Sequence, residues 1–393
     1  MKITEIRCAI IGRNPVVRLL TDAGLDGFGP VEHTKPWIKP HVMLLSDALI
    51  GQDPTDVERV MIRIRQRGAF KPFGAAVSAV EIALWDLAGK AAGVPVHKLL
   101  GGKVRDRVRV YNGAIRAPMT QFAPDDYAAS VRAMKAAPQG FTIVKQGIGF
   151  HSGMRDAMPG FHYGEQRPGA WHGWIERGPL TERGLGRIVD CAAAMKAELG
   201  DGIGLALDCG PGMLPADLLR LARAVEPLNL LWLEDAITGD YTPFVNADVY
   251  RDVTRATTTP IHTGEQIYLR QNFKALIETH AVNVIGPDPC DVGGLAELKW
   301  IAEYADLHGI LMAPHGIADG PLGIAALVQL CATLPDNYVA FELPNVDPEG
   351  VLLGLPDPLV RDGFIDVWDA PGLGVRFDPV KAQLAEEDSG FFD

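Results

Sequence analysis

Three short apolar stretches, each closed by an acidic residue, decide the fold: IGLALDCG (203–210), LNLLWLEDA (228–236) and TPIHTGEQ (259–266). An apolar run of roughly four to eight residues bounded by polar residues or glycine is typical of a buried parallel strand. The acids that end these runs lie 26 and 31 positions apart, and they are Asp208, Glu234 and Glu265. Because one βα unit of an eight-fold barrel takes roughly 30 residues, the spacing predicts one acid at the end of each of three consecutive barrel strands.

Three carboxylates at neighbouring strand ends would meet at the mouth of such a barrel. So much like charge is not tolerated unless a positive group neutralises it. Oxygen ligands alone, without Cys or His, favour a hard divalent cation, which is magnesium (Mg²⁺) first and manganese (Mn²⁺) second. The alternative is that these are ordinary acids that cap the next helix or bind Lys and Arg. Their occurrence at three consecutive strand ends favours the metal site.

The composition is that of an ordinary globular protein. With 393 residues, 47% hydrophobic and 22% charged, the chain can bury a large core and form two domains. The net charge of −12 argues against nucleic acid or an anionic membrane surface as the main partner. The polar start, MKITEIRCAIIGR, argues against a signal peptide, and long apolar runs are missing, so we expect no membrane span and a cytoplasmic protein. Five scattered Cys without CxxC spacing favour neither disulfides nor a zinc site.

The first forty residues predict an antiparallel hairpin and then an irregular stretch. Apolar residues within 1–20 and around Gly24 to Gly29 flank a TDAG turn. The stretch that continues to Pro40 contains Glu32 and Lys35. It fits either a mobile lid or an irregular connection, and the pattern does not choose between them.

The clearest helix of the chain is predicted for residues 75–92, AAVSAVEIALWDLAGKAA. Its apolar residues recur at intervals of three and four positions, and Gly93 supplies a stop. Two acids lie on it, Glu81 and Asp86. Since neither lies at a strand end, we interpret them as structural residues that pair with cations or cap helices.

From residue 108 onward strands and helices alternate. Val108, Val110 and Tyr111 form the first predicted strand, and FTIVKQG (141–147) forms the second, with Lys145 as its most conspicuous residue. After the three stretches described above, three further predicted strands end at or contain Asp288, His315 and Glu342. Eight strands between roughly 108 and 343 predict a barrel of the TIM type. The residues beyond them lack the βα period, and we expect them to return to the N-terminal domain.

The stretch from Gly149 to Pro179 has no convincing periodicity and is rich in Gly, Pro and aromatic residues. A structureless segment of that length inside a compact domain is usually functional. We expect it to lie over the barrel mouth. It contains four side chains that can exchange protons, His151, His162, Tyr163 and His172.

Taken together, these motifs resemble the enolase superfamily in its mandelate racemase branch. The stretch AVSAVEIALWDLAGKAAGVPVHKLLGG (76–102) is similar to the signature helix of its capping domain, and the strand-end motifs of its barrel are matched by LDCG, WLEDA, TGEQ, GPDPCDVGG, APHG and FELP. The resemblance covers essentially the whole chain. It implies an α/β fold, with an N-terminal α+β capping domain (1–112), a (β/α)7β modified TIM barrel (113–345) and a C-terminal segment (346–393) that completes the cap.

The resemblance also implies a role for each matching residue. Asp208, Glu234 and Glu265 would bind Mg²⁺, and His315 would be the general base, paired with Asp288. Lys145 would lie near the metal and the substrate carboxylate, which Glu342 would hydrogen-bond. These roles agree with the chemistry of removing the α-proton of a carboxylate. The resulting ene-diolate needs preorganised positive charge, and a neutral imidazole oriented by a carboxylate can accept the proton.

The departures from the family pattern concern the second acid or base. Gly147 stands where the second, basic lysine of a KxK motif would be, so a two-base racemase would lack one base. Cys209 and Gly210 follow Asp208, so the polar residue or histidine that many relatives carry two positions after this ligand is also missing. WLEDA and the terminal DAPGLGV (369–375) are shared with the mannonate dehydratase-like relatives.

These departures favour β-elimination of water from a sugar acid, giving a 2-keto-3-deoxy acid. His315 can act as the only base and return its proton to the departing hydroxyl. Tyr163, His151, His162 or His172 could assist as an acid, and the sequence does not rank them.

Two other functions stay open. One is an isomerase, either a racemase, an epimerase or a cycloisomerase, in which Lys145 is the second base. The other is a binding or regulatory protein that keeps the barrel without turnover. The sequence does not identify the sugar acid or its stereochemistry. The resemblance suggests a homo-oligomer that acts on a small carboxylate.

Overall fold

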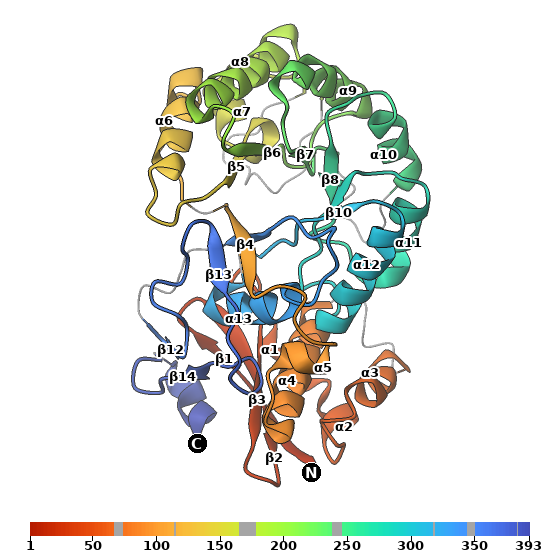
Figure 1. Cartoon of the computed structure of the whole chain (residues 1–393), viewed down its shortest axis with the longest axis vertical. Helices are drawn as coiled ribbons and strands as arrows, with labels where there is room; N and C mark the ends of the chain where they lie inside the picture. Colours follow the sequence, from red (N-terminus) through yellow and green to blue (C-terminus); the bar gives the residue numbers. More distant parts are fainter. Residues whose placement is uncertain are drawn as a thin grey trace.

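A computed structural model describes residues 1–66, 74–113, 115–164, 178–237, 246–316, 319–343, 350–382 and 384–393. It consists of two parts, which Figure 1 shows one above the other. The upper part is a curled parallel sheet with helices along its outer rim, and the lower part is a smaller α+β unit in which both chain termini lie.

The N-terminal part is built on a three-stranded antiparallel sheet in the order β1 (Ile3–Ile11), β2 (Asn14–Thr21) and β3 (Asp26–Pro30). The predicted hairpin is therefore confirmed, with one further strand pairing. At the turn, Thr21 Oγ1 accepts a hydrogen bond from Leu25 N at 3.2 Å. The helices that accompany this sheet are α1 (Lys39–Met43), α2 (Ser46–Leu49), α3 (Val57–Gln66), α4 (Gly74–Ala92) and α5 (Val96–Leu99).

Helix α4 is the predicted helix, and it lies against β3 at close range. A Cβ atom at Gly29 would come within 1.8 Å of the Ala79 carbonyl oxygen, so only glycine permits this approach. Glu81 accepts hydrogen bonds from Leu295 N (2.7 Å) and Ala296 N (3.0 Å), which caps a barrel helix. The structural interpretation of Glu81 is thus confirmed.

Asp86, the second acid of α4, is structural as well. Its carboxylate accepts hydrogen bonds from Phe28 N at 3.0 Å and from Leu373 N at 2.8 Å, and it pairs with Lys90 at 2.7 Å. It therefore joins β3, α4 and the C-terminal segment.

The barrel sheet contains the eight predicted strands: β4 (Arg107–Asn112), β5 (Ile143–Gly147), β6 (Gly204–Asp208), β7 (Trp232–Glu234), β8 (Ile261–Thr263), β9 (Val284–Ile285), β10 (Leu311–Met312) and β11 (Phe341–Leu343). From β4 to β10, each strand pairs in parallel with the next. β11 pairs in parallel with β4. A parallel bridge between Met312 and Tyr338 links β10 to the segment before β11, so the sheet closes. The modified TIM barrel is confirmed.

Helices follow the strands around the outside of the barrel (Figure 1). They are α6 (Pro124–Lys135), α8 (Glu182–Leu199), α9 (Pro215–Ala224), α10 (Ala247–Thr254), α11 (Arg270–Glu278), α12 (Leu295–Leu307) and α13 (Gly320–Cys331). Three short helical turns also occur: η1 (Gly149–His151), α7 (Met154–Ala157) and η2 (Glu226–Leu228). Apolar faces bury these helices against the strands, as the alternating pattern predicts.

The register of the sheet sets the height of each side chain in the barrel. Gly147 pairs with Asp208, and Asp208 pairs with Glu234, so these three residues share one level at the mouth. Lys145 lies two residues below this level on β5. Beneath it the barrel is filled by a small buried cluster, which includes Tyr111 and Trp232.

The C-terminal residues return to the cap, as predicted. β13 (Phe364–Asp366) pairs antiparallel with β4, and β12 (Leu352–Leu353) pairs with β14 (Arg376–Phe377). The last turn, η4 (Glu386–Phe392), packs on the cap sheet, where Arg18 donates a hydrogen bond to Phe391 O at 2.6 Å. β4 belongs to the barrel sheet although it lies within the range 1–112 assigned to the cap, and the domain boundaries themselves stay a prediction.

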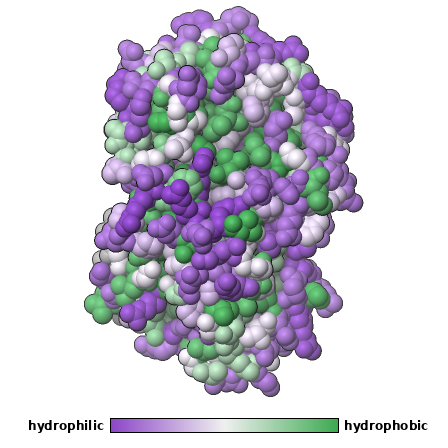
Figure 2. Space-filling model, viewed as in Figure 1, coloured by the Kyte–Doolittle hydropathy of each residue, from purple (hydrophilic) through white to green (hydrophobic). Residues whose placement is uncertain are grey.

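On the face shown in Figure 2, hydrophilic residues line the rim of the barrel half and hydrophobic residues gather toward its middle. Among the helices of the described ranges, none is long and apolar enough to cross a membrane.

Candidate active site

Lys145 lies at the centre of the barrel mouth, buried among acids from three other strands. Its Nζ donates a hydrogen bond to Glu234 Oε1 at 2.5 Å and lies 3.1 Å from the Glu342 carboxylate. Asp208 Oδ2 is 3.9 Å away. The structure thus brings the predicted lysine together with three of the predicted acids.

Two acids of the mouth, Glu234 and Glu265, differ in their electrostatic environment. Burial opposes ionisation of Glu234, but the charge of Lys145 and hydrogen bonds from Lys145 and Trp232 outweigh it and lower the pKa of Glu234 to about 2. Burial raises the pKa of Glu265 to about 8, and the neighbouring Asp208 and Glu234 push in the same direction. Glu234 is therefore held in its ionised form, whereas ionisation of Glu265 is opposed unless a positive charge lies beside it.

The donor atoms at the mouth fit a hard cation. Glu234, Asp235 and Glu265 each offer a carboxylate oxygen, and these oxygens lie within 4.8 Å of one another. Asp208 is not in this group, although it adjoins Glu234 through the strand register. Carboxylate oxygens are the ligands that Mg²⁺ or Mn²⁺ requires, so the residues present fit either ion.

Asp235 is an acid that the sequence argument missed. It follows Glu234 directly and has a backbone φ of +52°, which is rare for residues other than glycine. The only signal was the ED pair in WLEDA, and a pair on one strand does not tell which carboxylate faces the mouth.

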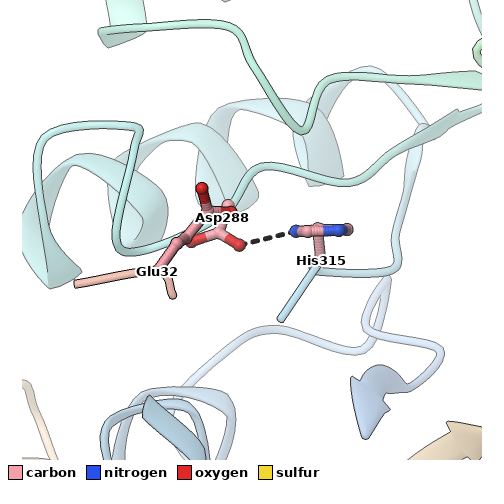
Figure 3. Close-up of side chains that lie close together, drawn as sticks. All are labelled: Glu32, Asp288 and His315. Carbon is pink, nitrogen blue, oxygen red and sulfur yellow. Dashed lines mark hydrogen bonds and ion pairs between the residues drawn. The ribbon is translucent and has the colours of Figure 1, made fainter. Parts of the chain in front are cut away.

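His315 and Asp288 form the predicted pair (Figure 3). Nδ1 of His315 lies 2.6 Å from Asp288 Oδ2, while the other nitrogen, Nε2, is 3.3 Å from Glu265 Oε2 and 3.5 Å from Glu342 Oε2. Both residues are buried, and Cys290 N donates a hydrogen bond to the second Asp288 oxygen at 2.6 Å. Asp288 thus fixes the imidazole through Nδ1, and Nε2 faces the acids of the mouth.

The charges around His315 favour its protonated form. Burial lowers its pKa, but the charge of Glu265, the hydrogen bond to Asp288 and the charge of Glu342 raise the pKa well above its usual value. A cation that neutralises Glu265 would remove part of this effect.

The cap contributes two side chains next to this pair. Donor atoms of Glu32, Asp288 and His315 lie within 4.8 Å of one another, and Figure 3 shows Glu32 beside Asp288. Lys35 Nζ bonds to Glu32 and to both Asp291 oxygens, at 2.6 and 2.7 Å. The sequence left this stretch open between a lid and a connection, and in the structure it contacts the barrel through buried charges.

The four loop residues that the sequence did not rank lie in different places. His151 reaches the mouth, where its Nε2 is 3.4 Å from Asp208 Oδ2. His162 is buried, with ring centroids 5.6 Å from Phe150 and 6.2 Å from Phe161, and Tyr163 is 76% exposed. His172 lies outside the described residues.

Comparisons with known proteins show the family of the chain. The family model described as "Enolase C-terminal domain-like" matches residues 126–381, and that of the "Mandelate racemase / muconate lactonizing enzyme, N-terminal domain" matches residues 12–101. The chain is 29% identical to the D-xylonate dehydratase of Haloferax volcanii over 99% of this chain and 90% of that protein. It is 30% identical to a D-galactonate dehydratase family member of Oceanicola granulosus over 98% and 95% of the two chains.

A solved structure gives the same result for the fold. An enolase from Agrobacterium radiobacter, described with bound Na, L-malate and an ordered active site, matches with a TM-score of 0.77 and 27% identity over 97% of this chain and 94% of that one. The chain therefore belongs to the mandelate racemase and muconate lactonizing enzyme branch of the enolase superfamily.

Proposed function

We propose that this protein is a Mg²⁺-dependent lyase that removes water from a sugar acid to give a 2-keto-3-deoxy acid. The observation that carries the proposal is the His315 imidazole, held by Asp288 at 2.6 Å with Nε2 turned to the acids of the mouth. The relatives named D-xylonate and D-galactonate dehydratase favour a sugar acid as substrate. L-Malate in the Agrobacterium structure is itself a 2-hydroxy acid.

The mouth contains groups suited to holding a substrate carboxylate. Asp208, Glu234 and Glu265 would bind Mg²⁺, which supplies the positive charge that an ene-diolate requires. Lys145 adds a second positive charge beside them. Burial raises the pKa of Glu342 above its usual value, so in its protonated form this residue can donate a hydrogen bond to the carboxylate.

The proton transfer falls to His315. A cation that neutralises Glu265 would favour the neutral form of His315. In that form Nδ1–H donates to Asp288, and the lone pair on Nε2 can take the α-proton. The electron pair of the broken C2–H bond then delocalises into the carboxylate. When it returns, the C2=C3 double bond forms and the C3–O bond breaks, so that the hydroxyl leaves with its electron pair and, once protonated, becomes water.

An isomerase is supported less well by the same residues. It needs Lys145 to act as a neutral base. The acids around Lys145 outweigh its burial and raise the pKa of this lysine well above its usual value, which favours a fixed positive charge. The predicted homo-oligomer is a separate matter and stays a prediction.

A substrate screen tests the proposal. The wild-type protein and a His315→Asn variant are incubated with aldonic, uronic and aldaric acids, D-xylonate and D-galactonate among them, with and without Mg²⁺. We expect a 2-keto product from the wild type only, and only with Mg²⁺. The same reactions in D₂O separate the alternatives, because α-deuterium exchange without loss of water would identify an isomerase instead.

A further inference from the structure

We propose that His151 is a second catalytic residue, the acid that protonates the departing hydroxyl. This inference rests on the proposed dehydratase function, and it assigns a step that His315 alone would otherwise have to complete. His151 lies on a loop, whereas His315 and the acids of the mouth lie at strand ends.

The first support is the way His151 is fixed at the mouth. It ends the short turn η1 directly after β5, and its backbone N–H donates to Cys209 O at 3.0 Å. Ile148 N donates to Asp208 O at 2.8 Å, so the loop follows the end of β6 residue by residue. The His151 side chain is 20% exposed, which leaves it accessible to a bound molecule.

The second support is the space that the His151 side chain occupies. A Cβ atom at Gly210 would lie 2.7 Å from His151 Cβ, and one at Gly147 would lie 2.8 Å from His151 Cδ2. Gly210 also has a φ of +61°, which disfavours a side chain there. These are the two positions at which the resemblance led us to expect a second functional side chain. Both are glycine, and His151 packs against both.

The third support is the separation of the two imidazoles. His315 follows β10 and contacts Glu265 and Glu342, whereas His151 follows β5 and contacts Asp208. In the order of the sheet, β6 to β9 lie between β5 and β10. Lys145, which contacts both Asp208 and Glu342, lies between the two histidines. A molecule bound at Lys145 therefore has one imidazole on either side.

This arrangement divides the elimination between two groups. His315 Nε2 takes the proton from C2, the C–H electron pair becomes the C2=C3 bond, and the C3–O bond breaks. His151 Nε2–H gives its proton to the leaving oxygen, and water is formed. When the enol product becomes the ketone, the His315 imidazolium gives its proton to C3 and the proton of the enol O–H passes to His151, so His315 is neutral and His151 is protonated as at the start.

Leaving-group chemistry tests this assignment. The acid with the fastest turnover in the screen above is compared with its 3-deoxy-3-fluoro analogue, because fluoride leaves with much less help from an acid. Four proteins are compared, the wild type and the variants His151→Asn, His315→Asn and Tyr163→Phe. Elimination is followed as 2-keto product, and proton abstraction is followed as α-deuterium exchange in D₂O.

We expect His151→Asn to lower elimination of the hydroxyl by about 10²- to 10⁴-fold, as for the loss of a general acid. It should still eliminate fluoride and exchange the α-proton, which also shows that the variant is folded. His315→Asn should lose all three reactions, and the exposed Tyr163→Phe should lose none. A His151→Asn variant that eliminates both leaving groups at the wild-type rate, or loses both equally, overturns the inference. A screen without any product overturns the proposed function, and this inference with it.

Discussion

The barrel mouth has two sides that hold a histidine in different ways. On the side of β8 to β11, His315 is fixed by charge, through Asp288 behind it and Glu265 and Glu342 in front. On the side of β5 and β6, His151 is fixed by backbone hydrogen bonds and by the close approach of two glycines. The first side is built at strand ends and the second on a loop.

This difference suits two different tasks. A base must be oriented and its positive form stabilised after it takes a proton, and surrounding carboxylates do both. A group that delivers a proton must lie at the right distance from the leaving oxygen, and misplacement by about 1 Å can cost about 10²-fold in rate. On the β8 to β11 side, charge therefore determines how the histidine works, and we call this the side governed by charge. On the β5 and β6 side, which we call the loop side, the position of the histidine determines it.

The largest expected loss of rate comes from removing a predicted cation ligand on either side of the mouth. Asp208→Asn changes an acid of the β6 side and Glu265→Gln an acid of the β8 side. We expect each to reduce kcat/KM by on the order of 10⁴-fold, since loss of the cation removes several kcal/mol of transition-state stabilisation. Mn²⁺ binding followed by electron paramagnetic resonance, together with kcat/KM, measures both losses.

The exposed Asp306→Asn on α12 is the matched control and should leave metal binding and rate unchanged. If either acid variant kept wild-type affinity for Mn²⁺, one cation would not be shared by the two sides.

The next effect concerns only the side governed by charge. In Asp288→Asn an amide can donate to His315 Nδ1, which places the ring proton on Nε2 and blocks the base. We expect kcat to fall by roughly 10²- to 10³-fold with little change in KM, and α-proton exchange to fall in parallel with elimination. Should exchange survive while elimination is lost, the Asp288 and His315 pair would not be the base.

The contrast between the two sides also explains what the sequence predicts. Residues at strand ends recur with the βα period, so Asp208, Glu234, Glu265, Asp288 and His315 could be identified from spacing and apolar runs. The fold followed from the same period, because eight runs of this kind close a barrel. The resemblance then added a role for each position.

The loop side carries no comparable signal. His151 lies in a stretch without periodicity, and the meaning of Gly147 and Gly210 depends on which side chain the folded loop places against them. Lys35 is visible in the sequence, but its contact with Asp291 joins residues 256 positions apart. Contacts of this kind depend on packing between distant segments, which spacing along the chain does not encode.

A smaller effect is expected when space on the loop side is changed without removal of any functional group. Gly147→Ala places a Cβ atom 2.8 Å from His151, so the imidazole must move. We expect elimination of the hydroxyl to fall by about 10- to 100-fold. Fluoride elimination and Mn²⁺ binding should change little.

Gly186→Ala is the matched control, because no atom lies within 4 Å of a Cβ at that position of α8. A Gly147→Ala variant with the full wild-type rate would show that the position of His151 does not matter.

The smallest effect on rate is expected from a change of Lys35. This cap residue pairs with Glu32 and Asp291 next to the side governed by charge. Lys35→Met leaves the buried Glu32 and Asp291 without their cation, and breaking such a buried pair costs about 3 kcal/mol of stability. The loss of activity should stay below about tenfold, because Lys35 contacts neither the mouth nor His315 directly. Thermal unfolding of Lys35→Met measures the cost, and Lys39→Met, which removes a half-exposed cation paired with Asp388, is the control.

The pH dependence of this cost has a definite sign. Burial raises the pKa of Asp291 to about 7, Glu32 pushes in the same direction, and Lys35 opposes both, so Lys35→Met should raise that pKa further. A carboxyl whose pKa is higher in the folded chain favours folding below its unfolded pKa of about 4, and this stability is lost as the pH rises through the folded value. The deficit of Lys35→Met should therefore grow from pH 5 to pH 8, and a second change, Asp291→Asn, should remove most of that growth. A stability deficit that did not change with pH would mean that Lys35 acts through packing. The influence of charge on this side of the mouth would then not extend to the cap.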